Sequence, residues 1–465
     1  MTPQPSRSAD QPAPSRGEPR ELTLAVGAPA HGGHCVARPV DDPSGRVIFV
    51  RHALPGETVR ARLTEMTSRT WRADAVEILQ ASPDRVESVW PEAGPAGVGG
   101  GELAHVALDA QRTWKRWVLA DCLRRIGGQE VADAVAALPE ASAAAAVPIE
   151  PMPADAAAQA SNSARRRALA GTATRTRVSL TVGEDGRPGM HAFRSGTVLP
   201  LRRLPLAVDA ITEIGLLERS RWRAHYRPGM RIEAIAPSGG EPVVLLDERL
   251  LTAQARSTGR RRVREVVDAS ALGLGELTYS VHAEGFWQVH VDAPRVLVER
   301  VVRGALGADL DGAAGSSVLE LYSGAGLFTL PLAALVGSGG EVVSLEGNEQ
   351  AVRDARRTLH DQPSARLASG RVSARSVREL AGSLTGGRPD VVVLDPPRQG
   401  AGREVIEAVG ALGAERIVLV ACDPAALARD LGTLLRSGYA LGSMSALDMF
   451  PHTHHFETIA VLERS

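Results

Sequence analysis

Residues Ser317–Gly326 read SVLELYSGAG, an apolar run typical of a buried strand that ends in a glycine turn. The apolar stretch 327–335 then continues as a predicted helix. Gly324 and Gly326 would let the backbone approach a ligand closely, and the N-terminus of the following helix would supply free amide donors. This strand–turn–helix unit predicts a Rossmann-like α/β domain with a ligand site at the turn.

Three further predicted strands end in polar residues. The stretch 341–345 leads to Glu346, 390–394 leads to Asp395, and 416–420 leads to Cys422. Strands alternate with helices from Leu277 to the end of the chain, which predicts a parallel sheet. Ligands bind at the carboxyl ends of such strands, so we expect the strand ends to form one pocket.

Glu346 lies about twenty residues after the glycine turn, where an acidic residue can accept both hydroxyls of a ribose. A tight turn and a solvated strand-end acid are the alternative explanation of each feature alone. Thr329 stands where a pyrophosphate fingerprint would have its third glycine. The pattern therefore favours S-adenosylmethionine, which has a ribose but no phosphate, over a dinucleotide.

The chain of 465 residues is too long for one core, because single cores stop growing near ~250–300 residues. Short strands separated by Gly and Pro turns at residues 21–85 predict a small β-barrel of the oligonucleotide-binding type. Residues 1–20 are expected to be a disordered leader. Residues 86–265 are expected to form a central α/β segment with a linker near 141–160, and residues 266–465 the catalytic domain.

The composition excludes several classes of protein. The 53 basic and 54 acidic residues give a net charge of −1, which excludes attraction to nucleic acid by global charge but permits a local basic face. Three scattered cysteines exclude a disulfide framework. No apolar run approaches the ~18 residues of a membrane span. We expect a cytoplasmic monomer without a membrane partner.

Two residues of the C-terminal half carry candidate covalent and acid–base chemistry. Cys422 follows a strand end at the start of a predicted helix, a position that could lower the pKa of its thiol, although a lone cysteine is more often a buried apolar residue. Glu457 directly precedes the last apolar strand, as either a solvated end or a base at the pocket. His452, His454 and His455 suggest a metal, but neighbouring side chains of an extended chain point in opposite directions, so we expect none.

The sequence resembles the RNA uracil-C5 methyltransferases that carry an N-terminal TRAM barrel and act on tRNA or ribosomal RNA. The resemblance covers nearly all of residues 20–465 and rests on short motifs. These motifs are Asp395-Pro396-Pro397-Arg398, Cys422-Asp423-Pro424-Ala425, Asp448-Met449-Phe450-Pro451-His452-Thr453, Phe456-Glu457-Thr458, Gly285-Phe286-Trp287-Gln288 and, in the barrel, Ala53-Leu54-Pro55-Gly56-Glu57.

The resemblance implies a mechanism and a site. Cys422 would be the nucleophile that attacks carbon 6 of uracil, Glu457 would be the base that removes the proton from carbon 5, and Asp395 would orient the substrate. The resemblance also implies S-adenosylmethionine as cofactor and RNA as partner. The expected cofactor-binding residues are Gln288, Tyr322, Gly324, Gly326, Glu346 and Asp395.

The chain departs from the family at one cofactor site. Many members hold an iron–sulfur cluster through cysteines after the barrel, but here the matching positions are Val98–Gly101 and Leu204, and no cysteine lies between Cys35 and Cys122. We therefore expect no iron–sulfur cluster and no metal. For RNA backbone contacts we expect the barrel arginines Arg38, Arg46, Arg51, Arg60 and Arg62.

Two alternatives remain open from the sequence. The first is a catalytically idle RNA-binding protein that keeps the fold, although such a protein has no need to retain both Cys422 and Glu457. The second is a methyltransferase for another substrate, such as an exocyclic amine, whose methylation requires no covalent thiol.

Overall fold

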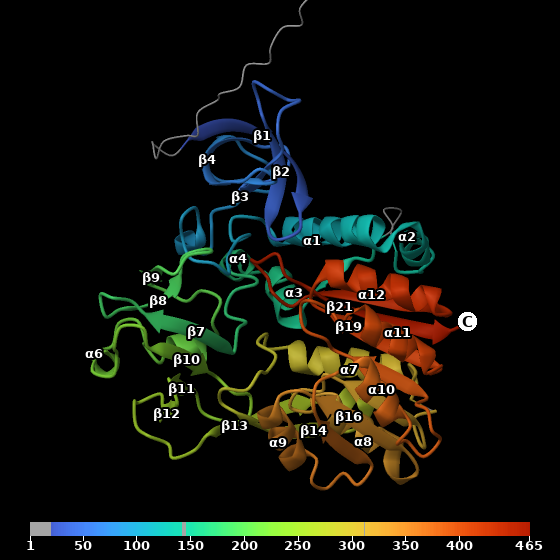
Figure 1. The fold of residues 1–465 in the computed structure, drawn as a ribbon. Helices are drawn as coiled ribbons and strands as arrows, with labels where there is room; N and C mark the ends of the chain where they lie inside the picture. The colour runs from blue at the N-terminus through green and yellow to red at the C-terminus, as the bar shows by residue number, and fades with distance from the viewer. Residues whose placement is uncertain (1–19, 142–145, 311) are drawn as a thin grey trace, which may run out of the picture. The chain divides into compact units, whose positions relative to one another are not determined.

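The computed structural model describes residues 20–141, 146–310 and 312–465 (Figure 1). Contacts divide these residues into two compact units, residues 20–30 with 34–83 and residues 31–33 with 84–465. Residues 1–19 of the expected leader lie outside the described residues. The boundary expected near residue 265 falls inside the second unit, within a strand, and stays a prediction. No helix in the described part of the chain is long and apolar enough to cross a membrane.

The first unit is a closed barrel with strand order β1-β2-β3-β5-β4, which confirms the predicted barrel. Side chains alternate across its wall, so that Val59 and Ala61 are fully buried while Arg60 and Arg62 between them face solvent. The strands are β1 (Glu21–Ala30), β2 (His34–Pro39), β3 (Ile48–Arg51), β4 (Thr58–Met66) and β5 (Trp71–Gln80).

The second unit contains a six-stranded antiparallel sheet in the order β12-β11-β10-β7-β8-β9. Trp222, which is fully buried, packs in the core beneath this sheet. The strands are β7 (Arg177–Val182), β8 (Pro188–His191), β9 (Val198–Pro200), β10 (Arg231–Ile235), β11 (Val243–Leu246) and β12 (Arg249–Thr252), with the short helices α5 (Asp209–Thr212) and α6 (Ser220–Arg223).

An eight-stranded sheet in the order β17-β16-β15-β18-β19-β21-β20-β6 forms the C-terminal half. Its strands are β6 (Ile149–Pro151), β15 (Ser317–Leu321), β16 (Glu341–Glu346), β17 (Ala365–Ser369), β18 (Val391–Leu394), β19 (Arg416–Ala421), β20 (Tyr439–Asp448) and β21 (Glu457–Arg464). A separate hairpin of β13 (Arg262–Asp268) and β14 (Glu276–His282) packs against the helix that follows β16.

Helices cover both faces of this sheet (Figure 1). The two-residue repeat of the strands divides the core, because Val318 faces one cluster of buried residues and Leu319 the other. The helices are α1 (Leu108–Cys122), α2 (Gln129–Ala136), α3 (Pro153–Gln159), α4 (Ala164–Ala168), α7 (Ala293–Leu306), α8 (Thr329–Val336), α9 (Glu349–Thr358), α10 (Ala374–Ala381), α11 (Arg403–Ala411) and α12 (Pro424–Arg436).

Two expectations need correction. The sheet is parallel from β17 to β19, but β21 runs antiparallel to both β19 and β20, and β6 then pairs in parallel with β20. A connection as short as 449–456 cannot cross over the sheet, so β20 and β21 pair as a hairpin. The stretch expected to be a linker carries β6, which adds to the edge of the main sheet, and α3.

Candidate active site

The polar residues predicted at the strand ends come level with one another at one edge of the sheet. Leu321 of β15 pairs with both Leu345 of β16 and Leu394 of β18. The next residues along these three strands are Tyr322, Glu346 and Asp395, which are three of the six residues expected to contact the cofactor. The parallel register therefore places one aromatic and two acidic residues side by side.

The glycine turn after β15 is closed by Glu346. Its carboxylate accepts hydrogen bonds from the backbone N–H of Gly324 at 2.9 Å and of Asn348 at 2.6 Å. Both Gly324 and Gly326 have positive φ, but a Cβ on Gly324 would meet open space. A Cβ on Gly326 would instead contact Ala355 of α9 at 3.4 Å. Gly324 therefore leaves room for a ligand, whereas Gly326 allows close packing.

A cleft of about 550 Å³ opens at this edge, a size typical of small-molecule sites. Of the predicted cofactor residues, Tyr322 and Glu346 line it. The sequence analysis missed the other side of the cleft, although the helix-capping signal of Asn348 could have drawn attention to that position. The lining residues that were not predicted are Gly347, Asn348, Arg371, Val372, Pro397, Gln399, Gly400, Ala401 and Gly402.

Gln288 lies buried in the loop between β14 and α7, outside the lining of this cleft. The loop is held by the strand region around β7. Arg177 donates a hydrogen bond to the carbonyl of Gly285 at 2.7 Å, and the backbone N–H of Thr176 donates to the carbonyl of Val289 at 2.8 Å. These contacts fix the backbone on both sides of Gln288.

Cys422 and Glu457 come together through the antiparallel pairing of β19 with β21. The pairing runs from Arg416 opposite Glu463 to Ala421 opposite Thr458, so the next step brings Cys422 level with Glu457. Cys422 is half-buried, while Glu457 is buried and its Oε1 has no hydrogen-bond partner among the described residues. A thiol and a carboxyl group thus share the edge that carries the cleft.

The two carboxyl groups of this cluster hold their protons unusually tightly. Burial and the charge of Glu346 raise the pKa of Asp395 to about 7. Burial and the charge of Asp395 raise the pKa of Glu457 well above its ordinary value, and Arg398 opposes this shift. Burial and the neighbouring Asp395 therefore favour the protonated form of Glu457.

The thiol of Cys422 does not have the lowered pKa that its position in the sequence suggested. Burial first, and then the charges of Glu457 and Asp395, raise its pKa to about 12. The N-terminus of α12 offers little compensation, because the side chain of Asp423 accepts the hydrogen bond from the N–H of Ala426 at 2.8 Å. The prediction was wrong because the environment of the thiol includes carboxyl groups from β18 and β21.

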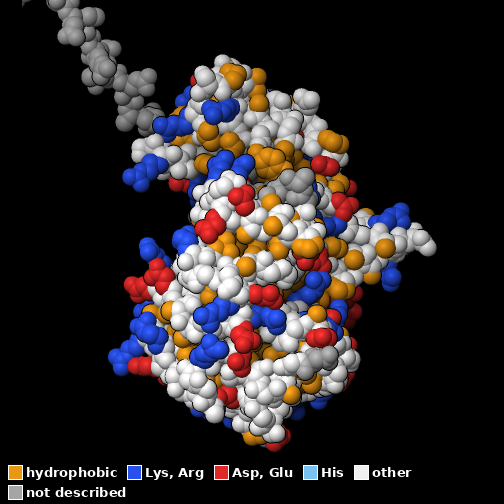
Figure 2. Space-filling model, turned by 90° about the vertical axis from the view of Figure 1, so that its right-hand side faces the viewer, with side chains coloured by type: hydrophobic (Ala, Val, Ile, Leu, Met, Phe, Trp, Pro, Cys, Tyr) orange, Lys and Arg blue, Asp and Glu red, His pale blue; other side chains and the backbone are white. Residues whose placement is uncertain are grey.

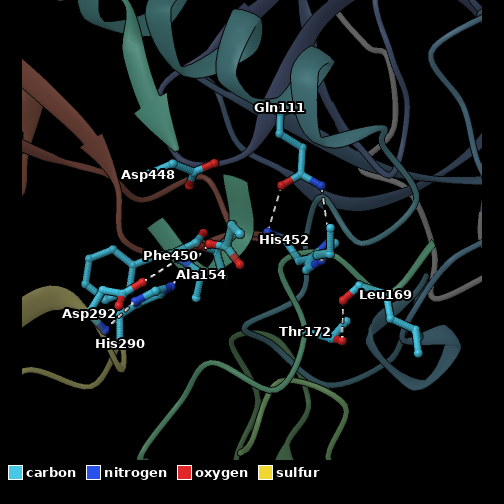
Figure 3. A network of polar contacts seen from close by, with 12 residues as sticks. Gln111, Ala154, Leu169, Thr172, His290, Asp292, Asp448, Phe450 and His452 are labelled. Carbon is cyan, nitrogen blue, oxygen red and sulfur yellow. Dashed lines mark hydrogen bonds and ion pairs between the residues drawn. The ribbon is translucent and has the colours of Figure 1, made fainter. Parts of the chain in front are cut away.

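The segment between β20 and β21 is anchored to α1 (Figure 3). Gln111 accepts a hydrogen bond from the backbone N–H of His452 at 2.7 Å and donates to its ring Nδ1 at 3.1 Å. Lys115, the only lysine of the chain, is fully buried, forms an ion pair with Asp448 and donates to the carbonyl of Phe450 at 3.1 Å. No sequence pattern pointed to Gln111 or Lys115, since neither of these two residues belongs to a recognised motif.

The histidines of this segment serve the fold. The rings of His454 and His455 lie 3.9 Å apart, which corrects the expectation of opposite directions, because residues 449–456 form turns rather than an extended strand. Burial, followed by the charge of His454, lowers the pKa of His455 to about 3. Among the described residues, no group of three or more His, Cys, Asp or Glu side chains is arranged to hold a metal.

The barrel arginines expected to contact RNA are largely engaged within the barrel. Arg51 is buried and forms a bidentate pair with Asp74 at 2.8 and 2.7 Å, which removes it from the candidates. Arg60 and Arg62 form ion pairs with acidic neighbours, and Arg46 lies over the ring of Trp71. On the face shown in Figure 2, basic and acidic side chains are interspersed, as the balanced composition leads one to expect.

Two family descriptions match the sequence. Residues 273–465 match the family described as tRNA (Uracil-5-)-methyltransferase, and residues 18–76 match the TRAM domain. An uncharacterized RNA methyltransferase of Streptomyces avermitilis is 39% identical over 95% of this chain and 98% of its own length. The 23S rRNA (uracil(1939)-C(5))-methyltransferase RlmD of Acinetobacter baumannii is 30% identical over 94% of this chain and 92% of its own length.

Among solved structures, the Pyrococcus abyssi tRNA (uracil-54, C5)-methyltransferase in complex with S-adenosyl-L-homocysteine is similar in fold. The TM-score is 0.62 at 20% sequence identity, over 94% of this chain and 99% of the other. The barrel, the central sheet and the eight-stranded sheet thus occur together in a known architecture.

Proposed function

This chain belongs to the RNA uracil-C5 methyltransferases and is an S-adenosylmethionine-dependent enzyme, and we propose that it forms 5-methyluridine in a tRNA or a ribosomal RNA through a covalent bond between Cys422 and the uracil. The position of Cys422 level with Glu457, one step beyond the pairing of Ala421 with Thr458, carries this proposal. A nucleophile and a separate base are what methylation at carbon 5 requires.

The residues around the cleft suit the cofactor. Glu346 provides a carboxylate able to accept ribose hydroxyls, Tyr322 provides an aromatic surface, and the open space at Gly324 leaves room for a ligand close to the backbone. Gln288 and Asp395 complete the proposed set of contacts. S-adenosylmethionine, when bound, supplies an electrophilic methyl group.

The duties of the protein groups follow from the weak nucleophilicity of uracil carbon 5. The thiol of Cys422 must first lose its proton, and the thiolate then forms a bond to carbon 6 that pushes electron density onto carbon 5, while Asp395 orients the base edge. After carbon 5 has been methylated, Glu457 removes the remaining proton from it, and the bond between Sγ and carbon 6 breaks. Glu457 must be ionised to act as this base. Because its pKa is raised, its carboxylate is a stronger base than an ordinary glutamate once its proton is released.

Two variants test this division of labour. Cys422→Ala should abolish methyl transfer and form no protein–RNA adduct. Glu457→Gln should attack and methylate but then stall, so that a covalent, already methylated adduct survives denaturing electrophoresis. RNA with 5-fluorouridine at the target should trap the unmutated enzyme in the same way, because fluorine cannot leave as a cation. An active Cys422→Ala enzyme would contradict the covalent mechanism and favour an amino methyltransferase.

The relatives with a named substrate support ribosomal RNA. Two of them, from Acinetobacter baumannii and Shewanella denitrificans, are named as 23S rRNA uracil(1939) enzymes at 30% and 28% identity. Nucleoside analysis of separated tRNA and ribosomal RNA from deletion and parent cells tests this assignment. Loss of 5-methyluridine from ribosomal RNA alone supports it, and loss from tRNA alone contradicts it.

A further inference from the structure

The sequence around α4 is rich in arginine, although Arg177 of this stretch is paired with Glu265. Residues 156–183 contain five arginines and no Asp or Glu, in a chain whose overall charge is −1. Arg165, Arg166 and Arg167 lie on α4 within the exposed run 162–169. Among the described residues, no carboxylate forms an ion pair with any of these three arginines, and Arg167 donates to the carbonyl of Ser161 at 2.8 Å.

Some exposed arginines on other helices of this protein are paired with acidic residues. Arg375 on α10 and Arg403 on α11 each form an ion pair with a glutamate four residues later, at 2.6 and 2.7 Å. These intrahelical pairs leave little charge for a partner. The guanidinium groups of α4 therefore differ from those of Arg375 and Arg403, which are paired within their own helices.

The turn after α4 packs on the segment that leads to Glu457. The ring Nδ1 of His452 accepts from Gln111 (Figure 3), and its Nε2–H donates to the carbonyl of Ala170 at 3.2 Å. Gly171 has φ +79°, and a Cβ there would come within 2.8 Å of this same Nε2. The hydroxyl of Thr172 closes the turn on the carbonyl of Leu169 at 2.6 Å. α4 is thus fixed directly beside residues 451 and 452.

Three consecutive guanidinium groups on one helical turn point about 100° apart, so they fan out rather than converge on one small anion. Such an arrangement suits successive phosphates of a polyanion, and arginine forks well onto phosphate. We propose that α4 binds the phosphate backbone of the substrate RNA beside the active-site segment. This inference rests on the RNA substrate of the proposed function and specifies the surface that holds the strand.

A pair of matched double variants tests this surface in the full chain. Arg165→Gln/Arg166→Gln removes two charges from α4. As the control, Arg356→Gln/Arg357→Gln removes two exposed charges from the C-terminal end of α9. Because α9 runs back from the carboxyl end of β16, these two residues lie toward the amino ends of the parallel strands, away from the active site. Binding of a fluorescently labelled single-stranded RNA of mixed sequence is measured over a series of salt concentrations.

The α4 variant should bind this RNA roughly tenfold more weakly near physiological salt. The magnitude of the slope of log affinity against log salt should fall by about 1.4, because each of the two lost phosphate contacts accounts for ~0.7. The α9 variant should match the unmutated protein. With RNA from deletion cells, the apparent KM of the α4 variant should rise while kcat at saturating RNA stays the same. Equal salt slopes for both variants, or a fall in kcat with unchanged RNA affinity, would overturn the proposal. The binding result is independent of catalysis, so an inactive unmutated enzyme would refute the proposed function alone.

Discussion

Replacing Lys115 with methionine should destabilise the second unit strongly. The side chains of Lys115 and Asp448 are 0% and 2% exposed, so Lys115→Met leaves a buried carboxylate without its cation. Removing one member of a buried ion pair costs about 3–5 kcal/mol. The carbonyl of Phe450 also loses its donor, which favours the upper end of this range.

The double variant Lys115→Met/Asp448→Asn separates the charge effect from simple loss of packing. It buries a neutral amide rather than an unpaired charge, and an unsatisfied polar group costs about 1–3 kcal/mol. The double variant should therefore be more stable than Lys115→Met by about 2 kcal/mol, despite carrying one more substitution. Asp448→Asn alone provides the remaining corner of the cycle.

Urea unfolding followed by tryptophan fluorescence provides the measurement, because Trp114 is buried next to Lys115 in α1. Amine acylation provides an independent one, since Lys115 is the only lysine. In the native unmutated protein, Lys115 should resist a reagent that modifies the terminal amine. A loss below about 1 kcal/mol for Lys115→Met, or prompt acylation of native Lys115, would show that the pair is open to water.

Three further predictions concern the cleft and the thiol. Glu457→Gln removes a nearby charge that, after burial, helps to raise the pKa of Cys422, so this pKa should fall. Alkylation of the thiol by iodoacetamide at a fixed alkaline pH should then become faster, with Cys422→Ala as the background. An unchanged pH profile of alkylation would show that burial alone raises this pKa. Glu346→Ala should weaken S-adenosylmethionine binding tenfold or more in calorimetry, because a charged hydrogen bond contributes about 1.5–3 kcal/mol. If the variant and the unmutated protein bind the cofactor equally well, Glu346 serves only to close the glycine turn. Asp395 keeps its proton up to about pH 7 in the folded state but loses it near pH 4 in the unfolded state. Its contribution to the free energy of unfolding is therefore present at low pH and is lost as the pH rises between these values. Asp395→Asn should flatten this part of the plot of unfolding free energy against pH, and an unaltered plot would contradict the raised pKa.

Local patterns in the sequence were enough to predict the elements that build the pocket. Continuous apolar runs identified β15, β16, β18 and β19, and glycine spacing identified the turn at Gly324. One general rule, that the carboxyl ends of parallel strands share an edge, then predicted that Glu346 and Asp395 lie near the glycine turn, and the register of β15, β16 and β18 brings these strand ends level. Such features depend on neighbours within a few residues, so the chain encodes them locally.

Only the tertiary structure decided the environment of each side chain. The antiparallel register of β21 placed Glu457 level with Cys422, and the carboxyl groups brought there by β18 and β21 raised a thiol pKa that local sequence suggested would fall. Lys115 and Arg51 are both buried because each forms an ion pair with an aspartate that is remote in the sequence, Asp448 and Asp74 respectively. Burial and electrostatic fields are sums over neighbours that are far apart in sequence, and no local pattern records them.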